Sequence, residues 1–176
     1  MRTTLAAIIL FASLSSCKNL VPYTDTMKQQ HNWSEAQIKQ IQFYVSEDVI
    51  LSRELTQGST EIVHGKIKKV NGKKVEEIII RQGTPGVLTE MPKEKKMLVS
   101  FEISDDYYLS FGVNPSMSEK YVLLASEWQN GSGKVHYNNQ VFYTSPGSKF
   151  AYLLVDLRKI QKMKVKQRVA GGRKVS

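Results

Sequence analysis

Few residues of this chain have the types and spacing that catalysis or metal binding requires. Its three histidines are His31, His64 and His136, and none belongs to a His-x-x-x-His pair, which would place two imidazoles on one helix face. Asp105 and Asp106 offer adjacent carboxylates to a cation, although an acidic turn is the more common meaning of such a pair. We therefore expect no metal, no cofactor and no catalysis.

Serine chemistry has no recognisable motif either. The sequence lacks a Gly-x-Ser-x-Gly nucleophile elbow, a phosphate-cradling glycine loop and a dinucleotide fingerprint. Catalytic groups can nevertheless be brought together by folding alone. A small envelope hydrolase is therefore kept as an alternative, in which His64 or His136 lies beside a carboxylate in a concave pocket.

The single cysteine, Cys17, ends an N-terminal segment with the features of an export signal. Arg2 supplies a positive charge, residues 5–14 are mostly apolar, and two serines lead into the cysteine. The apolar run is shorter than the roughly 20 residues of a membrane-spanning helix. The sequence Leu14-Ser15-Ser16-Cys17 resembles the lipobox of bacterial lipoproteins.

This resemblance covers the first 17 residues and implies a lipid anchor. In bacterial lipoproteins the cysteine carries diacylglycerol, the signal is cut before it, and the new N-terminus is often acylated. Residues 1–16 are accordingly expected to be a signal peptide and Cys17 the lipidated residue of a cell-envelope protein. Lys18, in place of an aspartate, favours the outer membrane with the domain facing the periplasm. The alternatives are a signal cleaved elsewhere and an uncleaved apolar N-terminus.

Positive charge is concentrated at the C-terminal end. Residues 158–176 hold eight basic residues and no acidic one, whereas residues 17–157 hold sixteen of each. Over residues 162–169 basic residues alternate with mostly apolar ones, which predicts a strand with one cationic face. The basic residues of this strand are Lys162, Lys164, Lys166 and Arg168.

The predicted cationic face is expected to bind an anionic polymer or an envelope protein. A solvated basic tail is one alternative, and protection of a sheet edge by lysines is another. Nucleic acid is disfavoured as a partner by the exported location.

Aromatic side chains are the other candidates for ligand contact. Trp128 stands at the predicted end of a strand, where its ring has the position to stack on a sugar or a proline-rich peptide. Other rings lie in or beside predicted strands: Tyr107, Tyr108, Tyr137, Phe142, Tyr143 and Tyr152. Rings exposed along a groove would indicate a peptidoglycan-binding module, but aromatic residues alternating in strands are more often part of the core.

Local patterns predict one short helix near the start of the domain. Ser34 and Gln37 have the spacing of a capping box, and Trp33 and Ile38 have that of a hydrophobic staple. A helix is therefore expected from Ser34 to near Val45.

The remainder of the chain predicts strands joined by tight turns. Asn71-Gly72 and Asn138-Asn139 predict the turns of two hairpins, and Thr84-Pro85-Gly86 predicts another turn. The run Ile78-Ile79-Ile80 predicts a strand buried on both faces.

The expected fold class is mainly β: a small, partly open barrel or sandwich of SH3-like or split-barrel type, with one short N-terminal helix. Residues 17–32 are expected to form a lipidated tether, residues 33–170 a single β-rich domain, and residues 171–176 a disordered tail. Similar turn sequences recur in the two halves of the domain. They leave open two similar subdomains, about 48–111 and 119–169, but shared turn chemistry is the favoured explanation, because the residues beyond the turns do not match.

Taken together, these features predict a lipid-anchored, noncatalytic protein of the bacterial cell envelope. Its expected partners are membrane lipid, through acylated Cys17, and an envelope protein complex or anionic polymer.

Overall fold

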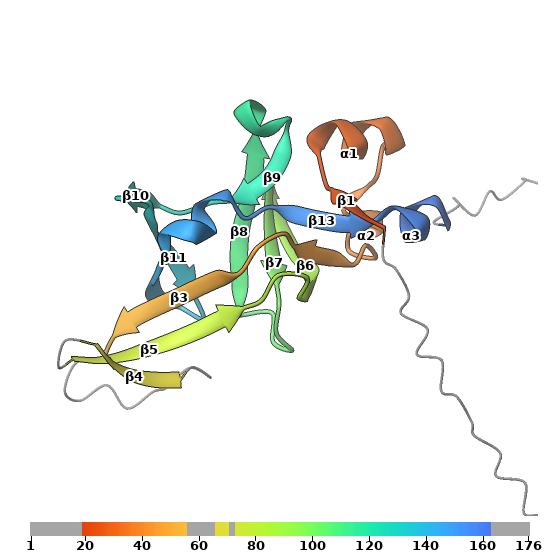
Figure 1. The fold of residues 1–176 in the computed structure, drawn as a ribbon. Coiled ribbons are helices and arrows are strands. Elements are labelled where there is room, and N and C mark those ends of the chain that lie inside the picture. Colours follow the sequence, from red (N-terminus) through yellow and green to blue (C-terminus); the bar gives the residue numbers. More distant parts are fainter. Residues whose placement is uncertain (1–18, 56–65, 71–72, 163–176) are drawn as a thin grey trace, which may run out of the picture.

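The structure is a computed structural model that describes residues 19–55, 66–70 and 73–162 (Figure 1). These residues form two antiparallel β-sheets, with short helices at the ends and edges of the strands. Within the described residues neither sheet closes on itself. The prediction of a mainly β, partly open fold is confirmed.

The larger sheet contains seven strands in the order β1-β13-β2-β6-β7-β8-β9. Their bounds are β1 Leu20–Pro22, β13 Leu153–Asp156, β2 Phe43–Val45, β6 Pro85–Lys93, β7 Lys96–Ser100, β8 Tyr108–Asn114 and β9 Lys120–Leu123. The sheet pairs the first strand of the fold with its last, because Leu20 lies opposite Asp156.

The smaller sheet contains six strands in the order β10-β11-β12-β3-β5-β4. Their bounds are β10 Glu127–Gln129, β11 Ser132–Tyr137, β12 Gln140–Thr144, β3 Val49–Glu54, β5 Lys73–Ile80 and β4 Lys66–Val70. Asn138 and Asn139 join β11 to β12 with φ angles of 47° and 57°, which confirms the predicted turn. Val70 lies opposite Lys73, as a two-residue connection requires, while Asn71-Gly72 itself lies outside the described residues.

The described residues also form five short helices: α1 Asp25–His31, α2 Glu35–Ile38, α3 Leu157–Lys162, and the 3-10 helices η1 Pro115–Met117 and η2 Pro146–Phe150. The capping box of α2 is confirmed, since the Ser34 N–H donates to Gln37 Oε1 at 2.9 Å. The helix ends at Ile38 rather than near Val45, because Phe43–Val45 pairs with both β13 and β6 as strand β2. None of the helices in the described residues is long and apolar enough to span a bilayer.

One face of each sheet is buried in a shared core. In β5 the side chains of Ile78 and Ile80 are buried, whereas Ile79 between them is 42% exposed. The prediction that this run is buried on both faces is therefore wrong. The strand follows the ordinary period of two, with one face in the core.

Residues 19–32 belong to the fold, so the predicted tether is wrong for this part of residues 17–32. After β1, Tyr23 is fully buried and packs edge to face against Phe43, with ring centroids 5.1 Å apart. Thr24 then caps α1 by accepting a hydrogen bond from the Met27 N–H at 3.1 Å. A strand of three residues is too short to display a hydrophobic period, which explains why the sequence pattern does not reveal it.

The predicted turn at Thr84-Pro85-Gly86 is displaced. The chain reverses just before it, where the Thr84 N–H donates to the Arg81 carbonyl and Gly83 has a φ of 76°. Pro85 and Gly86 instead begin β6, which proline tolerates at the first position of a strand.

The two segments with similar turn sequences do not form one sheet each. β12, from the later segment, pairs with β3 from the earlier one, and β9 pairs with β8 in the same way. Both sheets therefore combine strands from both segments.

Candidate functional site

Most residues predicted to bind a partner lie outside the described residues. They are Cys17, Lys164, Lys166 and Arg168, together with His64 of the hydrolase alternative. Lys162 is the last residue of α3, so the predicted strand over residues 162–169 begins in a helix. Arg158 and Lys159 in the same helix are exposed and start the basic run.

Trp128 is half-buried in β10, opposite Gly133 of β11. A Cβ atom added at Gly133 would come within 2.7 Å of the indole ring, so the ring lies directly against the glycine backbone. With Phe150 and Leu124, Trp128 also lines a hollow of about 260 Å³. Part of the ring therefore packs within the protein, and its contact with a ligand stays a prediction.

The other aromatic candidates divide between the core and the surface. Tyr137 and Phe142 are fully buried, and their rings meet edge to face at 6.1 Å. Tyr143 follows Phe142 in β12 but is 50% exposed on the opposite face. Tyr152 lies beneath the Lys120 ammonium, which is 4.3 Å from its ring centroid. These rings therefore point to different faces of the fold.

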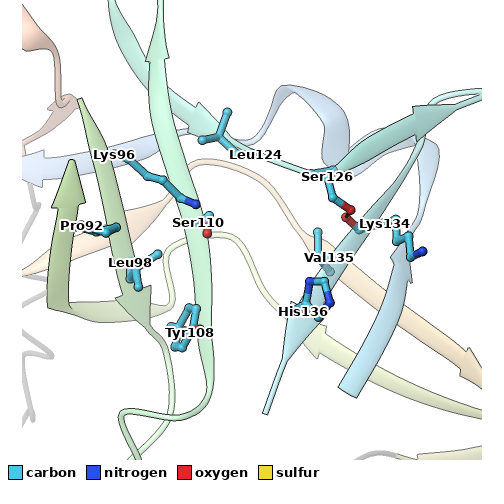
Figure 2. A pocket seen from close by; sticks show the side chains of 11 residues that line it. Pro92, Lys96, Leu98, Tyr108, Ser110, Leu124, Ser126, Lys134, Val135 and His136 are labelled. Carbon is cyan, nitrogen blue, oxygen red and sulfur yellow. Dashed lines mark hydrogen bonds between the residues drawn. The ribbon is translucent and has the colours of Figure 1, made fainter. Parts of the chain in front are cut away.

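A cleft of about 450 Å³ opens where the two sheets approach each other (Figure 2). β7 and β8 of the larger sheet form one wall, and β11 of the smaller sheet forms the other. Figure 2 shows Tyr108 and Ser110 on the first wall and His136 on the second, with Leu124 and Ser126 on the connection between them.

Strand alternation determines which side chains line the first wall. Met97, Leu109 and Phe111 are fully buried in the core. Lys96 and Ser110 occupy alternate positions of the same two strands and line the cleft on the opposite face.

Backbone hydrogen bonds fix the separation of the two walls. Leu124, after β9, donates its N–H to the Ser110 carbonyl at 2.8 Å. Two residues later, the Ser126 N–H and hydroxyl both donate to the Lys134 carbonyl, at 2.9 and 3.0 Å. The connection between the sheets therefore bridges β8 and β11 directly, which makes the cleft a preformed feature.

Among the described residues that line the cleft, Lys96, Lys134 and His136 are the charged and basic side chains, and none is a carboxylate. Within the described parts of the chain, none of these three side chains takes part in an ion pair. Glu127 lies opposite Lys134 in the neighbouring strand and shares a separate hollow of about 130 Å³ with it. The cleft therefore presents positive charge together with the hydroxyl groups of Tyr108 and Ser110.

Apolar side chains occupy the remaining surface of the cleft, among them Pro92, Leu98, Leu124 and Val135. Positive groups beside apolar carbon suit an anion that also carries a hydrophobic part, because both kinds of surface are then covered on binding.

Glu102 contacts β11 through Tyr137, on the face of the strand that points into the core. Tyr137 donates its hydroxyl to Glu102 Oε1 at 2.5 Å on the core side of the strand. Burial, followed by this hydrogen bond, raises the pKa of Tyr137 above its ordinary value. Glu102 is not one of the residues that line the cleft. In the part of the chain that the structure describes, His136 therefore has no carboxylate beside it in the cleft, in contrast to the arrangement that the hydrolase alternative expects.

Asp105 and Asp106 lie exposed between β7 and β8. Ser104 Oγ donates to Asp106 Oδ2 at 3.4 Å, as in an acidic turn. Across the described ranges, no group of three histidine, cysteine, aspartate or glutamate residues is placed to hold a metal ion.

Sequence reasoning singled out only His136 and Tyr108 among the residues of the cleft. Lys96 and Lys134 were missed because they stand 38 positions apart and come to line one cleft only through the packing of two sheets. The sequence offers only a weak signal for these two lysines. Each directly precedes an apolar strand residue that is buried, so strand alternation directs the lysine to the opposite face.

A scan of protein-family models matches none of them, and searches of curated proteins and of solved structures return no match.

Proposed function

We propose that this chain is a lipid-anchored, noncatalytic protein of the bacterial cell envelope, and that its cleft binds an anionic polymer of that envelope. The anchor is Cys17, as the lipobox resemblance implies, and the expected location is the outer membrane with the domain facing the periplasm. The observation that supports polymer binding is that Lys96, Lys134 and His136 line the cleft, with no carboxylate among its described lining residues.

The chemistry of these groups favours carboxylate or phosphate ligands. Lysine ammonium groups donate charge-assisted hydrogen bonds, which are about twice as strong as neutral ones. Tyr108 and Ser110 add hydroxyl donors on the same wall as Lys96. Lys134 and His136 belong to the other wall, so basic residues line both sides of the cleft.

The open shape of the cleft favours a polymer segment over a small enclosed metabolite. It lies between two sheets at the surface, where His136 and Leu124 are exposed. A polymer can extend past the rim while one or two of its anionic units occupy the cleft.

The test is calorimetric titration of the chain from Lys18 onward, which contains every described element, with polymers of different charge. Polygalacturonate supplies carboxylates, polyphosphate supplies phosphates, and dextran is the neutral control. We expect binding of at least one anionic polymer and none of dextran. The Lys96→Gln/Lys134→Gln variant should bind about tenfold or more weakly, since each lost charge-assisted hydrogen bond costs roughly 1.5–3 kcal/mol and solvent reduces this in an open cleft.

A matched variant, Lys39→Gln/Lys74→Gln, removes the same charge from exposed positions outside the cleft. It should bind like the unmodified chain. Equal binding by the cleft variant and the unmodified chain would contradict the proposal, as would equal binding of dextran and the anionic polymers.

A further inference from the structure

The hollow of about 260 Å³ that Trp128 and Phe150 line is a neighbour of the cleft. Leu124 lines both of them. In the cleft its side chain lies on the connection between the two sheets, as Figure 2 shows. The cleft and this aromatic hollow are therefore adjacent surfaces that share one side chain.

Strand β8 contributes to both surfaces. Tyr108 and Ser110 line the cleft, whereas Gly112 and Asn114 line the aromatic hollow. These four positions are two residues apart, so they share the face of β8 that points away from the core. At about 3.4 Å per residue they extend over about 20 Å. The combined surface is therefore elongated along β8.

Leu124 covers β8 where the two surfaces adjoin. Its N–H donates to the Ser110 carbonyl at 2.8 Å. A Cβ atom added at Gly112 would lie 2.6 Å from Leu124 Cδ1, so the leucine side chain lies directly on the glycine backbone. Leu124 is nevertheless 38% exposed. It therefore presents an apolar surface to a ligand that passes from the cleft to the aromatic hollow.

The aromatic hollow combines ring surface with positive charge. Phe150 is 54% exposed, and Trp128 beside it is half-buried. Lys149 also lines the hollow, with its Nζ 5.8 Å from the Phe150 ring centroid. None of the described residues that line this hollow is a carboxylate. Like the cleft, it therefore suits a ligand that is anionic and carries carbon surface.

We propose that the anionic polymer of the cleft is an acidic polysaccharide, and that a sugar unit next to the one in the cleft packs against Phe150 and Trp128. This inference rests on the proposed function and names the chemical class of its ligand. A pyranose ring has C–H groups that pack on aromatic carbon and hydroxyl groups that need hydrogen-bonding partners. The two hollows supply the aromatic rings, the hydroxyl groups of Tyr108 and Ser110, and cations for the carboxylates.

Other anionic polymers match only part of this surface. Polyphosphate has charge but no carbon surface, so it leaves the exposed ring of Phe150 uncovered. Polyglutamate has carboxylates on flexible side chains and has no ring to pack against an aromatic side chain. An acidic polysaccharide alone among these three covers both the cations and the aromatic rings.

The experiment compares polygalacturonate with polyglutamate of matched chain length, using calorimetric titration of the chain from Lys18 onward. Both polymers carry one carboxylate per monomer, so they differ in the sugar ring and not in charge. We expect polygalacturonate to bind about tenfold more tightly, as for roughly 50 Å² of additional apolar surface removed from water. The cleft variant Lys96→Gln/Lys134→Gln should weaken the binding of both polymers.

Phe150→Ala removes the most exposed ring of the aromatic hollow and leaves the cations of the cleft unchanged. It should weaken polygalacturonate about fivefold, as for roughly 40 Å² of apolar surface, and leave polyglutamate unaffected. The matched control is Ile103→Ala, which truncates a fully exposed apolar side chain that lines neither hollow. It should bind both polymers like the unmodified chain.

Tryptophan fluorescence reports contact with the aromatic hollow directly. The chain has two tryptophans, and Trp33→Phe leaves Trp128 as the single emitter. Polygalacturonate should shift the emission of this variant, whereas polyglutamate should not. An equal shift with both polymers would contradict the inference.

The outcomes separate this inference from the proposed function. Equal affinity for polygalacturonate and polyglutamate, or unchanged polygalacturonate binding by Phe150→Ala, would overturn the polysaccharide assignment. The proposed function would still hold if the cleft variant lost binding. Absence of binding to any anionic polymer would contradict the proposed function itself.

Discussion

Tyr23 and Tyr121 pack with ring centroids 5.1 Å apart, yet only one of their two hydroxyl groups is hydrogen-bonded. Tyr121 donates to Asp25 Oδ1 at 3.2 Å, whereas the buried Tyr23 hydroxyl has no partner among the described residues. Asp25 itself is 2% exposed and pairs with Lys95 at 3.2 Å. The cluster therefore holds one satisfied and one unsatisfied phenol side by side.

Replacing the unsatisfied phenol should stabilise the fold. Tyr23→Phe removes a buried hydroxyl that makes no hydrogen bond and keeps the ring that packs against Phe43. We expect the free energy of unfolding to rise by about 1 kcal/mol, which is the low end of the cost of an unsatisfied polar group. Urea denaturation followed by circular dichroism measures this change.

The matched substitution at Tyr121, whose hydroxyl is hydrogen-bonded, should lower the free energy of unfolding instead of raising it. Tyr121→Phe withdraws a hydrogen-bond donor from Asp25, which is buried and pairs with Lys95. We expect the free energy of unfolding to fall by about 1–2 kcal/mol in the same urea experiment. Equal destabilisation by both substitutions would show that the two hydroxyls have equivalent surroundings.

Alkaline pH should destabilise the protein through its buried tyrosines. Burial is the main cause that raises the pKa values of Tyr23, Tyr121 and Tyr137 above the ordinary tyrosine value of about 10. The folded state therefore holds these protons more tightly than the unfolded state, so their stabilising contribution is complete below pH about 10 and is lost as the pH rises further.

The expected loss is about 1.4 kcal/mol per pH unit for each of these tyrosines once the unfolded chain ionises. Urea denaturation at several alkaline pH values measures it, and phenolate absorbance of the folded protein reports which tyrosines ionise. If all eight tyrosines of the folded protein ionise near pH 10, this explanation is wrong.

The Arg53–Glu76 pair should be sensitive to the loss of one partner. Arg53 Nε donates to Glu76 Oε2 at 2.5 Å, and Glu76 is fully buried. Arg53→Met leaves a buried carboxylate without its cation, and we expect the free energy of unfolding to fall by about 3–5 kcal/mol. The double variant Arg53→Met/Glu76→Leu should recover most of this loss, because the uncompensated charge is gone.

A thermodynamic cycle of the two single variants and the double variant measures the coupling between Arg53 and Glu76. A double variant as unstable as Arg53→Met would indicate that the lost packing of the arginine side chain, rather than the buried charge, determines the effect.

Gly133→Ala should disturb the packing of the Trp128 indole ring against β11. The added methyl group would lie 2.7 Å from both the indole ring and the Ala125 side chain. We expect a loss of about 1–3 kcal/mol in the free energy of unfolding, together with a shift in tryptophan fluorescence.

Gly147→Ala is the matched control for this change, because nothing lies within 4 Å of the position of its added methyl group. Its free energy of unfolding should stay within about 0.5 kcal/mol of the unmodified chain. An unaltered fluorescence spectrum in Gly133→Ala would indicate that the indole moves freely away from β11.

The features predictable from sequence are those that depend on neighbouring residues. The capping box at Ser34 and the turn at Asn138-Asn139 each require only a few consecutive residues, so their local chemistry determines them. The mainly β class follows in the same way from the repeated period of two.

The features that were not predictable depend on residues far apart in the chain. β1 and β2 have three residues each, and both are strands because β13 lies between them. The cleft has the same origin, since Lys96 and Lys134 come to line it only after two sheets pack together. Composition indicates how much positive charge is present, but the arrangement of the strands determines where it gathers.

The position of β13 between β1 and β2 has a consequence for the order of folding. β1 and β2 are among the first strands to leave the ribosome, and β13 is the last strand of the described fold. The edge of the larger sheet cannot assemble until nearly all of the chain has been synthesised, and its closure must bring distant segments together at an entropic cost. Folding of this sheet is therefore a late event that requires the C-terminal strand, and a chain truncated before Leu153 leaves β1 and β2 without their shared partner.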